Sequence, residues 1–469
     1  IGPKDYQTNS GDGTEYTSNS VFGRITYDYA GRYLFQANVR HDGSSRFAKK
    51  YRWGTFPSFS AGWAISEESW MQEAKPWLSF LKLRASWGKL GNERIGDNYF
   101  PYMALMNFNN ALFYEGGETV SDKTAAQKAL AVEDITWETT TSTDLGLDLG
   151  FFRNRLNVNF DWYWKTTDDM LLSIEIPYFM GYNSPKTNAG KMATKGFDLE
   201  IGWNDRVGDF SYSVSANLSD FTSKIVDLNN SDIISGGKIQ REGCFFNEYY
   251  GYICDGIYQT QEEVANSATL NGSVTVGDLK YRDISGPDGV PDGKISAEYD
   301  RVPLGNSLPR FQYGGRFNCS WKGLDFSLVF QGIGKQNSYL SAAYVQPLRN
   351  NYGNIPSIID GKYWSPFNTA EENAAAQYPR LSKVSNDNNY ATSSFWIFNG
   401  AYFRLKNITL GYTLPEKWTS KAKMNRVRLY VSANDLFCFS KYPKGWDPEM
   451  GTSAYPITTS VLMGLSVKF

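Results

Sequence analysis

The sequence predicts an all-β fold: the C-terminal part, about 13 strands, of a transmembrane antiparallel β-barrel of about 22 strands with long extracellular loops. Three observations support this prediction. Apolar and polar residues alternate over many segments, these segments are long, and no apolar run approaches the roughly 20 residues of a spanning helix. Aromatic residues make up 16% of the 469 residues although the mean hydropathy is only -0.45, as expected when each strand has one apolar and one polar face.

The clearest alternation lies in residues 143–164. Along residues 143–151 the apolar side chains point one way, namely Leu145, Leu147, Leu149 and Phe151. Asp and Gly occupy the positions between them. After a short turn at Arg153-Asn154 the apolar residues alternate again, at Leu156, Val158, Phe160, Trp162 and Trp164. Two alternating segments joined by a short turn predict an antiparallel hairpin.

The same pattern predicts thirteen strands. They cover about residues 20–30, 32–42, 56–66, 79–90, 143–151, 156–164, 197–203, 210–218, 309–322, 324–333, 401–414, 427–437 and 461–469. Such strands suit a bilayer, which a tilted strand crosses with roughly 9 to 11 residues. Their polar faces carry Asp, Glu, Asn, Ser and Arg, which favours a wet lumen and argues against a dry sandwich core.

The connections alternate in length. Tight turns at Ala30-Gly31, Arg153-Asn154, 204–209 and Lys322-Gly323 are interleaved with long polar loops at about 91–138, 168–192, 223–308, 334–400 and 439–459. Outer-membrane barrels place short turns in the periplasm and long loops outside. We therefore expect barrel strands with loops in residues 1–222, an extracellular excursion in residues 223–308, and C-terminal barrel strands in residues 309–469.

The strand number has a consequence for the whole barrel. Bacterial barrels have an even number of strands, so thirteen cannot close one. If the barrel has about 22 strands, as plugged outer-membrane transporters do, about nine strands are expected to precede Ile1. The strand-like residues 245–258 are then expected to belong to the extracellular excursion.

The composition excludes several classes of protein. The formal net charge is -2, and the basic residues are dispersed, so the basic patch of a nucleic-acid binder is missing. The single histidine, His41, leaves no His cluster for zinc and lies at a strand end, where we expect a plain surface position. Scattered carboxylates show no acid–base arrangement, so we expect no enzyme and no catalytic cofactor. We expect no disulfide among the four cysteines.

Several motifs, taken in order, resemble the SusC/RagA family of TonB-dependent transporters. They are residues 31–34 (GRYL), 40–47 (RHDGSSRF), 56–60 (FPSFS), 81–88 (LKLRASWG), 402–412 (YFRLKNITLGY) and 447–449 (DPE). The resemblance covers essentially the whole chain. It implies a 22-strand barrel filled by an N-terminal plug, energised through TonB and capped by a SusD-like surface lipoprotein, with oligosaccharides or oligopeptides as cargo. We expect a preceding chain to supply the plug, the TonB box and the early strands that the family has before this region.

Two other functions stay open at this point. One is a passive, porin-like channel, which would conduct without a plug. The other is a surface adhesion β-protein, whose polar strand faces would meet solvent without a lumen. Detergent-dependent solubility would argue against the second alternative, and conductance without a plug would identify the first.

Residues 283–295 suggest a cation loop. Asp283, Ser285, Asp288 and Asp292 are closely spaced oxygen ligands next to turn-forming glycines, as in calcium loops. The spacing is imperfect, because Val290 and Tyr299 occupy positions that normally supply ligands. A structural calcium ion is therefore one prediction, and a solvated Asp-Gly turn is the alternative.

The remaining candidate residues are aromatic. Four tryptophans on apolar strand faces are expected to form a membrane girdle: Trp162, Trp164, Trp203 and Trp321. Six loop residues are candidates for contact with cargo or lipoprotein: Tyr344, Tyr352, Tyr363, Trp364, Tyr378 and Trp446. The terminal Phe469 ends a strand whose apolar face includes Val467 and Leu465, as in the assembly signal of outer-membrane barrels.

Overall fold

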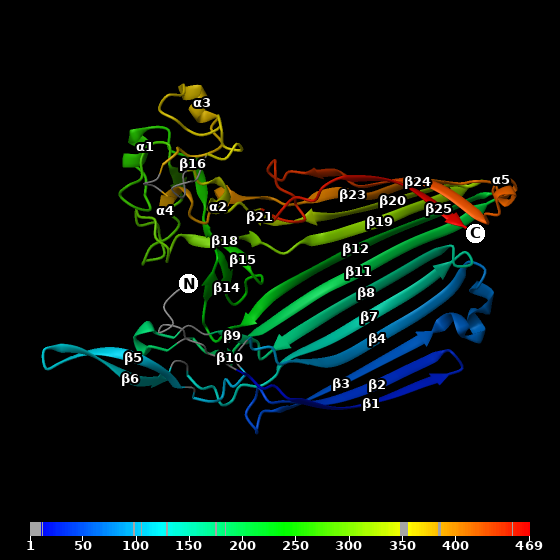
Figure 1. Cartoon of the computed structure of the whole chain (residues 1–469), viewed down its shortest axis with the longest axis horizontal. Coiled ribbons are helices and arrows are strands. Elements are labelled where there is room, and N and C mark those ends of the chain that lie inside the picture. The colour runs from blue at the N-terminus through cyan, green and yellow to red at the C-terminus, as the bar shows by residue number, and fades with distance from the viewer. Residues whose placement is uncertain are drawn as a thin grey trace, which may run out of the picture.

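A computed structural model describes residues 11, 13–96, 99–104, 106–127, 130–173, 176–182, 184–347, 355–382, 386–452 and 454–469. Its main feature is a 13-stranded antiparallel sheet, which confirms the predicted fold class and strand number. Figure 1 shows these strands tilted side by side in one curved sheet. Their order along the sheet is the chain order: β1 (Ser18–Tyr29), β2 (Tyr33–Ser44), β3 (Trp53–Ala64), β4 (Leu78–Asn92), β7 (Glu138–Phe151), β8 (Leu156–Asp168), β11 (Lys191–Val207), β12 (Phe210–Asp227), β19 (Arg310–Trp321), β20 (Leu324–Lys335), β23 (Tyr402–Thr413), β24 (Arg426–Ser440) and β25 (Ser460–Lys468).

The register of β7 and β8 explains the two faces of the sheet. Leu145 pairs with Trp162 and Leu147 with Phe160, so these apolar side chains share one face. The intervening Asp148 pairs with Asn159 on the other face, as successive side chains of a strand point to opposite sides. We call the apolar side the outer face and the polar side the inner face.

The sheet is open. Within the described residues β1 pairs only with β2 and β25 only with β24, so each presents one free edge. Most strands have 12 to 15 residues, but β11 has 17 and β12 has 18. These two strands exceed the roughly 9 to 11 residues that a bilayer requires and extend past it.

One end of the sheet, the turn end, carries short connections. Residues in the left-handed region close three of these turns: Ala30 (φ 57°), Asn154 (φ 61°) and Lys322 (φ 46°). The predicted turn at 204–209 is shorter than expected, because β11 continues to Val207, which pairs with Phe210. The other turn-end connections contain η2 (Ile65–Glu67) with η3 (Ser69–Ala74), and α5 (Glu416–Thr419) with η6 (Ser420–Ala422).

The opposite end, the loop end, carries the long connections. The hairpin of β5 (Met106–Glu115) and β6 (Glu118–Gln127) extends away from the sheet, at the left of Figure 1. Sequence alternation did not indicate this hairpin within the loop at 91–138. The connection after β8 contains β9 (Leu171–Ser173), η4 (Tyr178–Met180) and β10 (Lys186–Asn188).

The described residues of two long connections, 223–308 and 334–400, pack into one unit that we call the loop body. Its strands are β13 (Ile233–Ser235), β14 (Lys238–Gln240), β15 (Glu248–Tyr252), β16 (Cys254–Ile257), β17 (Leu279–Tyr281), β18 (Arg301–Asn306), β21 (Asn337–Tyr339) and β22 (Ile397–Asn399). Its helices are α1 (Gln261–Ala265), α2 (Ala342–Val345), α3 (Ala370–Ala374), α4 (Asn386–Asn389) and η5 (Ser394–Trp396). The predicted strand-like segment 245–258 contributes β15 and β16, which lie outside the main sheet.

The loop body has a core of its own. Residues from both connections form the largest buried cluster: Tyr252, Leu279, Tyr281, Ile295, Leu340, Val345 and Trp396. Backbone bonds join the connections directly, as the N–H of Tyr252 donates to the carbonyl of Thr392 at 3.0 Å. The loop body therefore lies at the loop end as a packed structure rather than as separate solvated loops (Figure 1).

Two further features complete the fold. None of the helices described here has the length and apolar character needed to cross a membrane. The four cysteines, Cys244, Cys254, Cys319 and Cys438, are free thiols.

Candidate transport site

The inner face of the sheet is held together by ion pairs between strands. Arg84 on β4 reaches Asp148 on β7, with 2.8 Å from Nη2 to Oδ1. The same guanidinium reaches Asp161 on β8, with 2.9 Å from Nη1 to Oδ1. One arginine thus bridges three strands, which a planar fork of donors does well.

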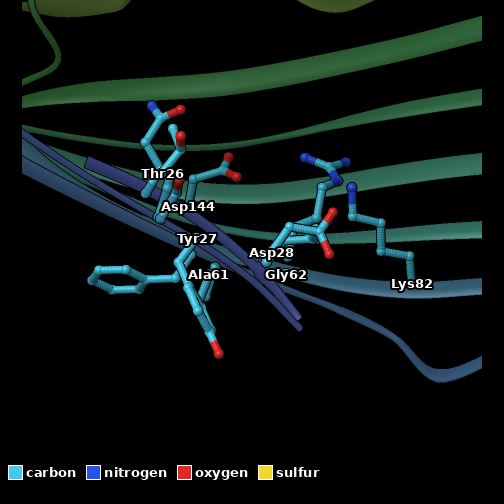
Figure 2. Close-up of a pocket in the computed structure, with 14 residues that line it drawn as sticks. Thr26, Tyr27, Asp28, Ala61, Gly62, Lys82 and Asp144 are labelled. Atoms are coloured by element: carbon cyan, nitrogen blue, oxygen red, sulfur yellow. The ribbon is translucent and has the colours of Figure 1, made fainter. Parts of the chain in front are cut away.

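A cavity of about 450 Å³ opens on the inner face of β1 to β4 and β7. Figure 2 shows Asp28, Lys82 and Asp144 around it, together with the small residues Ala61 and Gly62. Charged groups of both signs line this wall of the sheet. Such a wall suits water and polar contacts rather than an apolar core.

Several carboxylates at the middle of the inner face have no ion-pair partner among the described residues. Asp144, Asp198 and Glu200 lie on β7 and β11, and none forms an ion pair within the described part of the chain. Asp198 and Glu200 are exposed. Unpaired carboxylates require solvent or a polar partner, so this face is expected to border a wet lumen.

A second cavity of about 690 Å³ lies on the inner face nearer the loop end. Its lining is rich in amide and hydroxyl groups, among them Asn217, Ser219, Gln312 and Gln331, and it also includes several aromatic rings, such as that of Tyr163. These groups come from strands β8, β12, β19 and β20. Because amides and hydroxyls both donate and accept hydrogen bonds, this wall can contact an uncharged polar ligand.

Buried polar contacts tie the two connections of the loop body together. Asp278, which is fully buried, binds Arg380 with 2.7 Å from Oδ1 to Nε. Asn389 donates to the same carboxylate at 2.8 Å. Burial also raises the pKa of Glu248, although the N–H of Phe245 donates to its carboxylate at 3.1 Å. The loop body is thus joined by a specific polar network as well as by its apolar core.

The predicted loop aromatics are mostly part of this packing. Tyr378 stacks on Trp396 at 6.2 Å, and Trp446 meets Tyr344 edge to face at 6.3 Å. Tyr378 and Trp446 pack against the core of the loop body. Trp364 is partly buried, and its indole lies against the backbone of Gly277. The backbone of Tyr363 forms an isolated parallel β-bridge with that of Tyr378. Tyr352 lies outside the described residues. Their contact with cargo or lipoprotein remains a prediction, to be weighed against this structural role.

The four predicted girdle tryptophans all lie on the outer face. Trp162, Trp164 and Trp321 are 46%, 36% and 50% exposed. Trp203 is partly covered, because its ring lies 6.3 Å from that of Phe152. Trp203 and Trp321 lie towards the turn end, whereas Trp162 and Trp164 lie towards the loop end. Two levels of aromatic residues are expected at the two interfaces of a bilayer.

The terminal Phe469 follows β25 at the turn end and is 81% exposed (Figure 1). Val467 and Leu465 precede it on the last strand, which pairs with β24 through the whole segment. Its role in assembly is untested by these contacts and stays a prediction.

The predicted cation loop is only partly assembled. Asp283 accepts a bond from the N–H of Gly293 at 2.7 Å, and its other oxygen is buried without a hydrogen-bond partner. Asp292 lies close to Gly286, whereas Ser285 bonds its neighbouring backbone and Asp288 is exposed. No cluster of three or more His, Cys, Asp or Glu side chains suited to a metal ion occurs in the described residues. The orphan oxygen of Asp283 fits a cation, but the full ligand set does not converge on it.

The sequence did not indicate a buried charge cluster around Arg404. This residue, on the inner face of β23, is only 2% exposed and contacts Asp447 and Glu449. Burial acts to raise the pKa of Asp447, but hydrogen bonds from Arg404 and from the N–H of Glu449 outweigh it, so this pKa lies below its usual value. Both motifs, 402–412 and 447–449, stood out in the sequence, but no pattern showed that they meet.

Comparison with known proteins decides the family. The family model described as "TonB dependent receptor-like, beta-barrel" matches residues 1–436. The chain belongs to this TonB-dependent receptor family. SusC of Bacteroides thetaiotaomicron is 32% identical over 97% of the chain and 44% of its own length. A TonB-dependent receptor of Formosa agariphila is 32% identical over 99% of the chain and 48% of its own length.

A solved structure, the RagAB peptide transporter, has the same fold with a TM-score of 0.78 and 25% identity, covering 97% of this chain and 47% of that one. These similarities confirm the predicted SusC/RagA resemblance and the Gram-negative outer membrane as the location of this TonB-dependent barrel. The family comprises transporters rather than enzymes. The chain spans about half the length of the curated relatives that it matches.

Proposed function

We propose that the chain forms the C-terminal barrel wall and part of the extracellular roof of a TonB-dependent importer of a bulky nutrient. The observation that carries this proposal is the combination of a membrane-type sheet with a polar inner face and a packed loop body at its loop end. A sheet of this kind separates lipid from a wet passage. The family supports active import as the activity of the complete protein.

The proposal includes the partners that the resemblance implies. The free edges of β1 and β25 can pair with further barrel strands, and the relatives have about twice the length of this chain. We therefore infer that an N-terminal portion of the same transporter supplies the remaining strands, the plug and the contact with TonB. A SusD-like surface lipoprotein is proposed to close over the loop end, and outer-membrane lipid to cover the outer face.

The cargo is proposed to be an oligosaccharide or an oligopeptide. The inner face offers amide, hydroxyl and charged groups rather than an apolar pocket, which supports a polar cargo of either class. Of the similar proteins, one is a SusC and another is a peptide transporter. Both classes therefore stay within the proposal.

The decisive experiment measures uptake by the complete transporter in its host. Cells with and without the transporter are given fluorescent mixtures of neutral oligosaccharides and of oligopeptides, before and after collapse of the proton gradient. Active import predicts transporter-dependent accumulation that stops when the gradient collapses. Accumulation that survives collapse would establish the porin-like alternative, and surface binding without accumulation would favour an adhesion protein.

A second measurement tests the partners. Mass spectrometry of the detergent-purified complex is expected to find plug-bearing residues, in this or an accompanying polypeptide, and a lipoprotein of the SusD type. A complex that holds this barrel part alone would contradict the proposed assembly.

A further inference from the structure

A cluster of five charged side chains lies on the inner face at the loop end. Arg404 binds Asp447 with 2.6 Å from Nη2 to Oδ2, and binds Glu449 with 2.6 Å from Nε to Oε1. Lys406 binds Asp435 with 2.6 Å from Nζ to Oδ1 and reaches Glu449 at 3.4 Å. The cluster joins β23, β24 and the connection between β24 and β25.

Irregular strand pairing places these groups together. The register between β23 and β24 shifts between Leu405 and Asn407, and Asp435 lies in the left-handed region with φ 52°. Lys406 on β23 therefore lies opposite two unpaired residues of β24, Asp435 and Leu436, in an irregular part of the ladder. Bulges re-aim side chains, and this one brings Lys406 and Asp435 within ion-pair distance of each other.

The connection that carries Asp447 and Glu449 also reaches the loop body. We call residues 445–451 the strap; its two ends, Gly445 (φ 95°) and Gly451 (φ 73°), lie in the left-handed region, where glycine is favoured. The N–H of Gly451 donates to the carbonyl of Asp447 at 2.8 Å, which closes the strap into a tight turn.

Neighbouring residues of the strap contact different parts of the molecule. Asp447 is buried against Arg404 on the barrel wall, whereas Trp446 packs against the core of the loop body and meets Tyr344 edge to face. One peptide bond therefore links an ionic contact in the lumen to an apolar contact in the loop body. The two contacts thus lie on adjacent residues of one short backbone segment.

We propose that Arg404 is a positioning residue that clamps the strap to the barrel wall and thereby fixes the position of the loop body over the lumen. The clamp itself follows from the contacts of the described residues and does not depend on the cargo. Its value for transport rests on the proposed import function, in which the loop body forms part of the roof.

The test compares Arg404→Gln with a matched control, Arg428→Gln, in the complete transporter in detergent. Arg428 of β24 also pairs with a carboxylate on the inner face, Asp325 of β20, at 2.9 Å across the intervening strand β23. Among the described residues it forms no ion pair with the strap or the loop body. Hydrogen exchange is followed by mass spectrometry in residues 445–451, in residues 339–347 around Tyr344, and in β7 and β8. Exchange reports local opening of each segment separately.

The clamp predicts that Arg404→Gln accelerates exchange at least about tenfold in the strap and in residues 339–347, and leaves β7 and β8 unchanged, because removing one partner of a buried pair leaves uncompensated charges. Arg428→Gln should not accelerate exchange in either segment. Arg404→Lys keeps one positive charge beside Asp447 and Glu449 and should hold protection to within about threefold of the unaltered protein, which the uncharged Arg404→Gln cannot do.

Two results would overturn the proposal: an unchanged strap in Arg404→Gln, or equal acceleration in strap and sheet. If Arg404→Gln fails to insert into the membrane, Asp447→Asn tests the same contact from the strap, outside the barrel strands. If the exchange results support the clamp but the unaltered transporter takes up no cargo, only the import function is contradicted. The two ideas can therefore fail separately.

Discussion

The main sheet and the loop body are built on different physical principles. In the sheet, many large apolar side chains remain exposed on the outer face, such as Ile25, Phe59 and Leu83. In the loop body, Leu279, Trp396 and Val345 are buried to 5% exposure or less. The sheet therefore depends on its hydrogen-bond ladder and on lipid for burial, whereas the loop body makes its own dry core in water. Changes of the same kind should have different results in the two regions.

The largest effect is expected in the core of the loop body. Trp396→Ala removes a side chain that is 3% exposed and stacks on Tyr390, and such truncations cost about 3 to 5 kcal/mol. We expect the loop body to become protease-sensitive while the barrel keeps its heat-resistant mobility on gels. Phe367→Ala, at a 96% exposed position of the same region, is the control and should change neither property. Simultaneous loss of barrel and loop body would show that the two regions do not fold independently.

The second effect tests the faces of the sheet. Leu147→Lys places a charge on the outer face next to Phe160, where lipid contact makes a midplane charge cost about 2 to 4 kcal/mol. Asn159→Lys, on the inner face of the neighbouring strand, should cost less than about 1 kcal/mol because a wet lumen solvates the charge. Denaturant titration in detergent or bilayers measures both. Equal losses at the two positions would contradict the assignment of inner and outer faces.

A smaller effect is expected from calcium. If Asp283 and Asp292 hold an ion, free calcium at about ten times its dissociation constant stabilises this segment by roughly 1.4 kcal/mol, and chelation removes that stabilisation. Limited proteolysis of residues 283–295 should become faster, and the barrel should be unaffected. Asp283→Asn should show the same sensitivity without chelator. Identical proteolysis with and without chelator would leave the solvated turn as the correct interpretation.

The smallest effect on stability is expected at Phe469. Its side chain is 81% exposed, so Phe469→Ala should change the free energy of unfolding by less than about 0.5 kcal/mol. The amount of assembled barrel in the outer membrane should nevertheless fall several-fold if this residue is read during insertion. Tyr455→Ala, at an equally exposed aromatic of the last long connection, is the control. Equal amounts of assembled barrel for both variants would remove the assembly role.

The main sheet could be predicted from local patterns because each of its strands meets two uniform environments. A strand such as β7 alternates Leu with Asp or Gly because one side faces lipid and the other faces polar surroundings. That requirement repeats at every second residue and is therefore visible without knowing the neighbours. The positions of the strand ends could not be predicted as closely, as β11 shows. Beyond the membrane a polar residue can belong to a strand or to a turn, so the sequence pattern does not mark where the strand stops.

The loop body and the Arg404 cluster could not be predicted in this way. Tyr378 and Trp446 were expected to be available to cargo or partner, but both pack against a core formed by segments more than one hundred residues apart. Their burial depends on which loops meet. The same is true of Arg404 and Asp447, which are 43 residues apart and meet through an irregular part of the ladder and a strap.

The sequence by itself determined the fold class, the number of strands, the two faces of the sheet and the likeness to one transporter family. These properties follow from a repeated local requirement, the alternation of side chains between lipid and lumen. The tertiary structure alone decided which loops share a core and how the strap joins that core to the barrel wall. Contacts between distant segments depend on the path of the whole chain, and that path leaves no period in the sequence.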